Sequence, residues 1–199
     1  MLKSINLSLE SRAAYDCFGV ATTSLELARR ANEQWEIEHH SITGITFVAF
    51  SIEAMINHFG KIYFPDWNYS KECRKSSHKK LFKAVNLPNY LGTKEYQVAI
   101  CCFDLRDMLA HGKSLNEKLT IELPKDTDSK SIFQHMLSVG SKPFREVSYE
   151  LLESFVDTSR KIERDIEQNG FYPNQEHVSQ ELREKLCEGP LSVSGIRTW

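Results

Sequence analysis

Arg106, Asp107 and His111 lie close together in the chain, and their side chains suit proton transfer and charge stabilisation at one site. An arginine stabilises negative charge that develops on a substrate, and a histidine transfers protons near neutral pH. Asp107 and His111 are four residues apart, so on a helix the carboxylate reaches the imidazole and favours its protonated form. Arg106 and His111 are five residues apart and point about 140° away from each other, so they cannot hold one ligand from a single helix face.

Glu53 is a carboxylate in the middle of the most apolar helical segment of the chain, residues 41–64. A buried carboxylate needs a positively charged or hydrogen-bonding partner. Small residues recur at helical spacing on this segment and on the segment that carries Arg106, which permits close approach of the two helices. We therefore expect Glu53 to pair with Arg106, or with His111, across a narrow groove. A purely structural arginine–glutamate pair is the alternative interpretation.

Residues 71–83 form a strongly basic segment, KECRKSSHKKLFK, in which Glu72 is the one acidic residue. Trp67 and Tyr69 come shortly before it. Lysine and arginine side chains neutralise the phosphates of single-stranded nucleic acids, and aromatic rings stack on the bases. The lysines that we expect to contact RNA are Lys75, Lys79, Lys80, Lys83 and Lys113. The alternative interpretation is an exposed, solvated short helix.

Hydrophobic periodicity predicts an all-α fold whose helices position these side chains. Long helices are expected at about 9–36, 41–64, 94–112 and 148–168, and shorter ones at about 77–85, 132–137 and 177–187. Ser41 and Thr93 are the expected N-caps of the helices that follow them. Alternating apolar residues predict a short strand at 118–123. The predicted fold is thus an up-and-down helical bundle with a short strand insertion, in a domain at 1–170 followed by a C-terminal extension at 171–199.

The 199 residues carry a formal net charge of −2, so nucleic-acid binding must depend on a local basic patch. The longest apolar run falls short of the ~20 residues of a membrane span, and the N-terminal residues contain no secretory hydrophobic segment. Cysteines without a CxxC pair indicate reduced thiols in a cytoplasmic protein. Motifs for dinucleotides, P-loop nucleotides, α/β-hydrolases and zinc are lacking. We therefore expect neither a cofactor nor a metal ion.

The segment LRDMLAHGK, on a helix that follows one carrying IEAMINHFGK, resembles the HEPN superfamily. The signature of that superfamily is an arginine, a polar residue, a few further residues and then a histidine. Arg106, Asp107 and His111 match these positions. Glu53 and Asn57 are similar to the polar helix positions that many members place beside the motif. The resemblance extends over most of the chain, but only the segment around the motif is specific.

The resemblance implies a HEPN-like all-helical domain that dimerises and brings two motifs into one cleft. Active members are metal-independent endoribonucleases that cut single-stranded RNA and leave a 2′,3′-cyclic phosphate. Carried over to this chain, the catalytic residues are Arg106, His111, Asp107 and Glu53. Arg106 would stabilise charge on the phosphorane, His111 would act as general acid or base, and Asp107 would orient the imidazole.

Other functions remain open for such a domain. Some members of the superfamily are toxins held silent by an antitoxin, and others act in phage defence. Others are non-catalytic modules that bind a protein partner or a nucleotide through the same groove. The expected partners are therefore RNA, a second copy of the chain, and an antitoxin or other protein, with no role for a membrane.

Overall fold

The computed structural model describes residues 13–68, 73–111, 120, 122–138 and 147–170. Its helices are α1 (Ala13–Arg30), α2 (Gln34–Tyr63), α3 (Arg74–Ala84), the short 3₁₀ helix η1 (Tyr90–Gly92), α4 (Lys94–His111), α5 (Ser129–Ser138) and α7 (Tyr149–Asn169). No strand occurs within these described residues. The prediction of an all-α fold is therefore confirmed.

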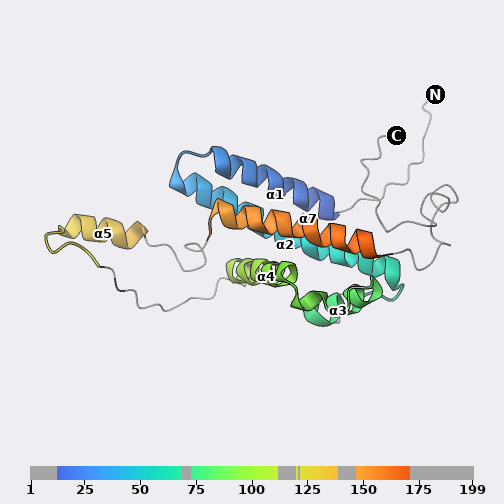
Figure 1. Cartoon of the computed structure of the whole chain (residues 1–199). Helices are drawn as coiled ribbons and strands as arrows, with labels where there is room; N and C mark the ends of the chain where they lie inside the picture. Colours follow the sequence, from blue (N-terminus) through green and yellow to red (C-terminus); the bar gives the residue numbers. More distant parts are fainter. Residues whose placement is uncertain (1–12, 69–72, 112–119, 121, 139–146, 171–199) are drawn as a thin grey trace, which may run out of the picture.

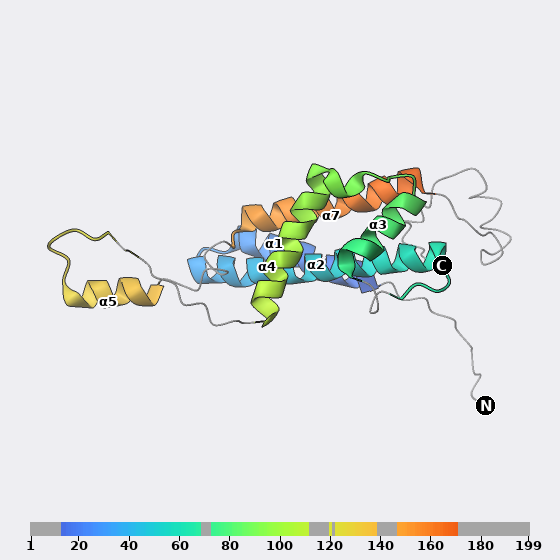
Figure 2. The same cartoon turned by 90° about the horizontal axis from the view of Figure 1, so that it is seen from below.

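Helices α1, α2 and α7 lie side by side with similar axis directions, whereas α4 crosses α2 and α7 at a steep angle (Figures 1 and 2). Helix α3 lies beside the C-terminal part of α2 (Figure 2). Helix α5 stands apart from this bundle (Figure 1). Helix α2 therefore contacts α1, α3, α4 and α7, and it forms the centre of the fold.

The central position of α2 follows from its apolar and small residues. Ile45, Val48 and Ile52 are fully buried in the core. Gly44 lets α7 approach closely, because a Cβ atom at this position would lie 2.4 Å from Leu152 Cδ2. Close packing of this kind fixes the relative positions of the helices that carry polar side chains.

By length and composition, α2 also qualifies as a membrane-spanning helix, contrary to the expectation that no segment would. It is the one helix in the described part of the chain that does so. Half of the qualifying window is buried inside the bundle, and the core helix of a soluble protein passes the same test. The composition of α2 is therefore only weak support for membrane insertion.

The helices predicted at about 94–112 and 148–168 are confirmed as α4 and α7. Helix α4 begins after Thr93, whose Oγ1 accepts a hydrogen bond from the Tyr96 N–H at 3.3 Å, as expected of an N-cap. Helix α7 begins after Ser148, whose Oγ accepts from the Leu151 N–H at 3.2 Å. These caps fix where each helix starts relative to its neighbours.

The predicted start of the second helix is wrong. Ser41 does not cap a helix: it is fully buried within α2, which already begins at Gln34. Residues 34–40 contain no Gly or Pro that would prevent the helix from extending upstream, and the chain instead breaks at 31–33, where Glu33 is extended (φ −98°, ψ 136°). Trp35 consequently belongs to α2 and not to the first helix.

The predicted strand at 118–123 is not found at Thr120, Glu122 or Leu123, none of which has strand geometry. Residues 118, 119 and 121 lie outside the described residues. So do the C-terminal extension at 171–199 and its predicted helix at 177–187. The short helix predicted at 132–137 is present as part of α5.

Candidate functional site

Arg106 of α4 and Glu53 of α2 form the ion pair that the sequence predicted. Arg106 Nη2 donates to Glu53 Oε1 at 2.6 Å, and only 14% and 18% of the two side chains are exposed. The helices also approach each other closely at Cys102, one turn before Arg106. There the Cys102 thiol donates a long hydrogen bond to the Ile45 carbonyl, with Sγ 3.7 Å from the oxygen.

Two further charged residues complete an ion network, defined here as Glu53, Arg74, Arg106 and Asp107. Arg74, the first residue of α3, places Nη2 3.1 Å from Glu53 Oε1 and 3.2 Å from Asp107 Oδ2. Arg106 Nη1 lies 3.1 Å from Asp107 Oδ1. Each arginine therefore bridges both carboxylates, and the four charges balance.

Aromatic rings support both guanidinium groups of the ion network. The Arg106 guanidinium carbon lies 5.3 Å from the centre of the Phe50 ring, and that of Arg74 lies 4.6 Å from the Phe103 ring. Such cation–π contacts hold a guanidinium plane in one orientation. The Nε of Arg106 is buried and has no hydrogen-bond partner within the described residues.

His78 connects the ion network to the core. This fully buried side chain packs against Phe103, and its Nδ1 lies 3.0 Å from the Tyr96 hydroxyl. Burial, with a smaller effect from the charge on Arg74, lowers the pKa of His78 to about 3. The imidazole is therefore neutral near neutral pH and forms part of the support for the charged residues above it.

The structure does not bring His111 to the ion network. His111 is the exposed last residue of α4, and in the described part of the chain it makes no hydrogen bond or ion pair. The sequence predicted that the Asp107 carboxylate contacts the imidazole of His111. In the structure this carboxylate contacts Arg74 and Arg106 instead. Arg106 faces α2, so one protomer presents the arginine and the histidine of the motif on different sides of α4.

Residues 74–83 of the basic segment lie in α3, and their lysines differ in their surroundings. Lys75, Lys79 and Lys83 are exposed and spaced four residues apart, so they form one stripe on the helix. Lys80 is half-buried, with Nζ 4.4 Å from the centre of the Phe64 ring. Lys113 lies outside the described residues.

Trp67 is not available as an exposed stacking ring, so that expectation is corrected. Its Nε1–H donates to Asn57 Oδ1 at 3.0 Å, and its ring stacks on Phe64 with centroids 5.8 Å apart. The ring also lies directly over Gly60, where an added Cβ would meet it at 2.2 Å. Trp67 and Asn57 therefore fasten the segment after α2 onto that helix, and Tyr69 is outside the described residues.

Comparison with known protein families, curated proteins and solved structures gives no match. The chemistry of the site therefore has to follow from its own geometry. Among the residues that the structure describes, no three His, Cys, Asp or Glu side chains are grouped so as to hold a metal ion.

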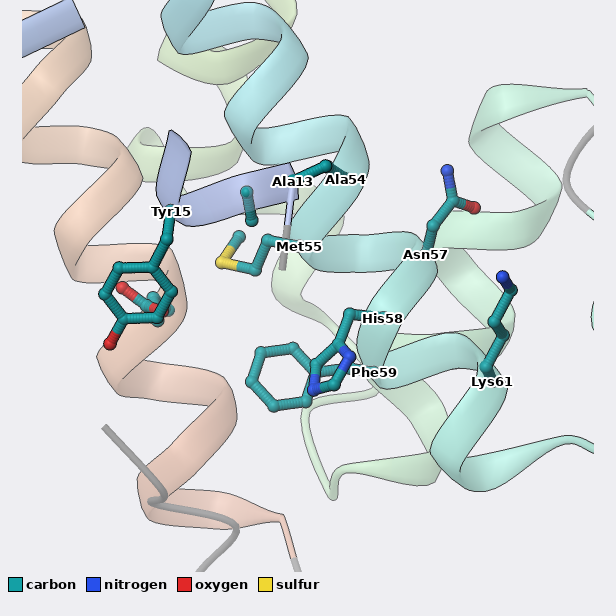
Figure 3. Close-up of a pocket in the computed structure, with 10 residues that line it drawn as sticks. Ala13, Tyr15, Ala54, Met55, Asn57, His58, Phe59 and Lys61 are labelled. Carbon is teal, nitrogen blue, oxygen red and sulfur yellow. The ribbon is translucent and has the colours of Figure 1, made fainter. Parts of the chain in front are cut away.

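A separate pocket of 440 Å³ opens between α1, α2 and α7. Figure 3 shows the Tyr15, Met55, His58 and Phe59 side chains gathered on one side of α2, with Lys61 directed elsewhere. No sequence pattern selects His58, because no acidic residue stands three or four positions from it. The pocket contains no residue of the ion network.

Arg74 is the site residue that sequence reasoning missed. It stood among the lysines of a basic segment, and its type and spacing did not set it apart from them. The helix was predicted to begin at about 77, whereas it begins at Arg74, so the predicted helix did not include this arginine. Arg74 can be identified as a site residue only from the packing of α3 against α2 and α4, which no local sequence pattern encodes.

Proposed function

We propose that this protein is a metal-independent endoribonuclease with a HEPN-like bundle that cuts single-stranded RNA in the cytoplasm. The observation that carries the proposal is the placement of Arg106. Its guanidinium is held by two carboxylates and an aromatic ring, and 14% of the Arg106 side chain is exposed. A pre-oriented guanidinium at a solvent-accessible edge is suited to stabilising an anionic transition state.

The proposed reaction is an intramolecular transesterification. The RNA 2′-oxygen attacks the adjacent phosphorus and loses its proton to a general base, while the bond from phosphorus to the 5′-oxygen breaks. A general acid returns a proton to that leaving oxygen, and the product ends in a 2′,3′-cyclic phosphate. Arg106 balances charge on the phosphorane, and His111 supplies the proton transfer.

A second copy of the chain completes the site in this proposal. Within one protomer Arg106 points into the ion network, whereas His111 is exposed at the end of α4. A two-fold dimer would place the arginine of one copy beside the histidine of the other, so that the dimer has two such sites. Phe50, which lies beside Arg106 and is 39% exposed, offers an apolar contact for such a dimer.

The proposal is tested by cleavage of labelled single-stranded RNA in EDTA. We expect the wild-type protein to cut, and His111→Ala and Arg106→Ala to lose at least about 100-fold in rate, because each removes a transition-state interaction. The control is His39→Ala, which removes an exposed histidine from another part of the bundle. A 5′ product without a cyclic phosphate, or full activity in His111→Ala, would contradict the mechanism.

A non-catalytic binding module is the second candidate, and the charge balance of the ion network favours it. Each of the four charged groups already has partners of opposite sign, as in a structural ion network. In that case the protein would cut none of several RNAs, and wild-type and His111→Ala chains would be expressed equally well. A toxin silenced by an antitoxin would instead be inactive only while its partner is bound.

A further inference from the structure

Arg74 occupies a position equivalent to that of Arg106 in the ion network. A single oxygen, Glu53 Oε1, lies 3.1 Å from Arg74 Nη2 and 2.6 Å from Arg106 Nη2. The carboxylate of Asp107 is likewise shared, one oxygen to each arginine. The two guanidinium groups are therefore neighbours, although they come from α3 and α4.

We propose that Arg74 is a second phosphate-binding arginine of this site. The inference rests on the proposed function, because it assigns Arg74 to the same RNA phosphate that Arg106 would contact. A phosphodiester has two non-bridging oxygens, and two adjacent guanidinium groups can donate to both of them. A phosphate between the arginines would take over the acceptor positions that the carboxylates of Glu53 and Asp107 occupy in the unliganded site.

The location of Arg74 also connects the ion network with the basic face of α3. Arg74 is the first residue of that helix, and its side chain is 28% exposed. Lys75 follows directly, and Lys79 and Lys83 continue the exposed stripe at intervals of about 6 Å along the axis. An RNA strand whose phosphate lies at Arg74 and Arg106 can thus extend along α3, where further phosphates meet these lysines.

The test measures binding of a single-stranded RNA with 2′-O-methyl groups, which lacks the attacking hydroxyl and cannot be cut. Fluorescence anisotropy gives its dissociation constant over a range of salt concentrations for wild type, Arg74→Ala, Arg74→Lys and Arg106→Ala. The matched control is Arg160→Ala on α7. Arg160 also lies over a phenylalanine ring, 5.2 Å from the centre of Phe18, and 3.8 Å from a carboxylate oxygen of Asp157.

We expect Arg74→Ala to weaken binding about tenfold or more, as loss of a charged hydrogen bond does. The slope of log affinity against log salt should become shallower by about 0.7, because one phosphate contact is lost. Arg74→Lys keeps the charge and should retain the wild-type slope with an intermediate affinity. Arg160→Ala should match wild type in both measurements.

The outcomes separate this inference from the proposed function. If wild type cuts RNA but Arg74→Ala and Arg74→Lys bind RNA like Arg160→Ala, Arg74 has only a structural role. The inference then fails while the proposed function stands. If wild type cuts nothing but Arg74→Ala and Arg106→Ala weaken binding similarly, the phosphate site stands and the nuclease proposal fails. Absence of RNA binding by the wild-type protein would overturn both. Arg74→Lys keeps the test valid if Arg74→Ala does not fold.

Discussion

A buried neutral histidine supports the charged residues of the candidate site. His78 is fully buried under Arg74, between the Tyr96 hydroxyl and the Phe103 ring, and Phe103 in turn carries the Arg74 guanidinium. Protonating His78 would place a second positive charge beneath that guanidinium in a fully buried position. Residues that never touch a substrate thus determine how the arginines of the ion network are held.

We predict that His78 makes the protein less stable in mild acid. Its pKa is about 3 in the folded state and 6.5 ordinarily, so below pH 6.5 the unfolded chain binds a proton that the folded chain excludes. The free energy of unfolding should then fall by about 1.4 kcal/mol per pH unit as the pH decreases from about 6.5 towards 3. Urea unfolding at pH 7 and pH 5 measures the difference.

The control variants isolate this effect from the titration of carboxylates. His78→Gln removes the titrating group, so its stability should change less between the two pH values than that of wild type. His39→Gln, at an exposed histidine, should retain the wild-type pH dependence. Equal pH dependence in wild type and His78→Gln would show that His78 is protonated in the folded state.

At this scale the sequence predicted one half of the ion network. The pair of Glu53 and Arg106 could be predicted because a lone carboxylate on an apolar helix requires a partner, and the pair is confirmed. The contacts of Arg74 could not be predicted, since they depend on how α3 packs beside α2 and α4. Asp107 was correctly placed on α4, but its contacts with two arginines were not foreseen.

Close contacts between helices position the site at the level of elements. The Cys102 thiol reaches the Ile45 carbonyl between α4 and α2, and burial raises the pKa of this thiol well above its ordinary range, so it stays protonated. Gly44 likewise allows α7 to pack closely against α2. Periodicity predicted these helices because it reports which face is buried. Periodicity did not predict the break between α1 and α2 at 31–33, where neither a proline nor a side-chain capping hydrogen bond marks the boundary.

We predict opposite effects of alanine at two helical glycines. Gly44→Ala places a Cβ within 2.4 Å of Leu152 Cδ2, so α7 must move or Leu152 must change rotamer, and stability should fall by about 1–3 kcal/mol. Gly19→Ala, on α1 with nothing within 4 Å of the added Cβ, should instead raise stability by about 0.5–1 kcal/mol. Thermal unfolding of both variants measures the two stability changes. A stabilised Gly44→Ala protein would show that α2 and α7 are less closely packed than described.

The architecture of the whole molecule separates the two halves of the motif. Because α4 crosses α2 and α7 steeply, its middle is enclosed while its last turn extends beyond the contact (Figure 2). Arg106 is partly buried and faces α2, whereas His111 is at the exposed end of α4. A single protomer therefore has the arginine and the histidine in different places, which is why the proposed function includes a second copy of the chain.

We predict that two inactive variants regain activity when mixed. If each site takes Arg106 from one protomer and His111 from the other, a dimer of Arg106→Ala with His111→Ala has one intact site and one doubly altered site. After equal mixing and exchange of subunits, about half of the dimers are mixed and half of their sites are intact, so RNA cleavage should recover to roughly a quarter of wild type. Sedimentation of the mixture verifies that dimers are present. Dimers that stay inactive would show that both residues must act within one protomer, which would require α4 or the segment after it to rearrange when RNA binds.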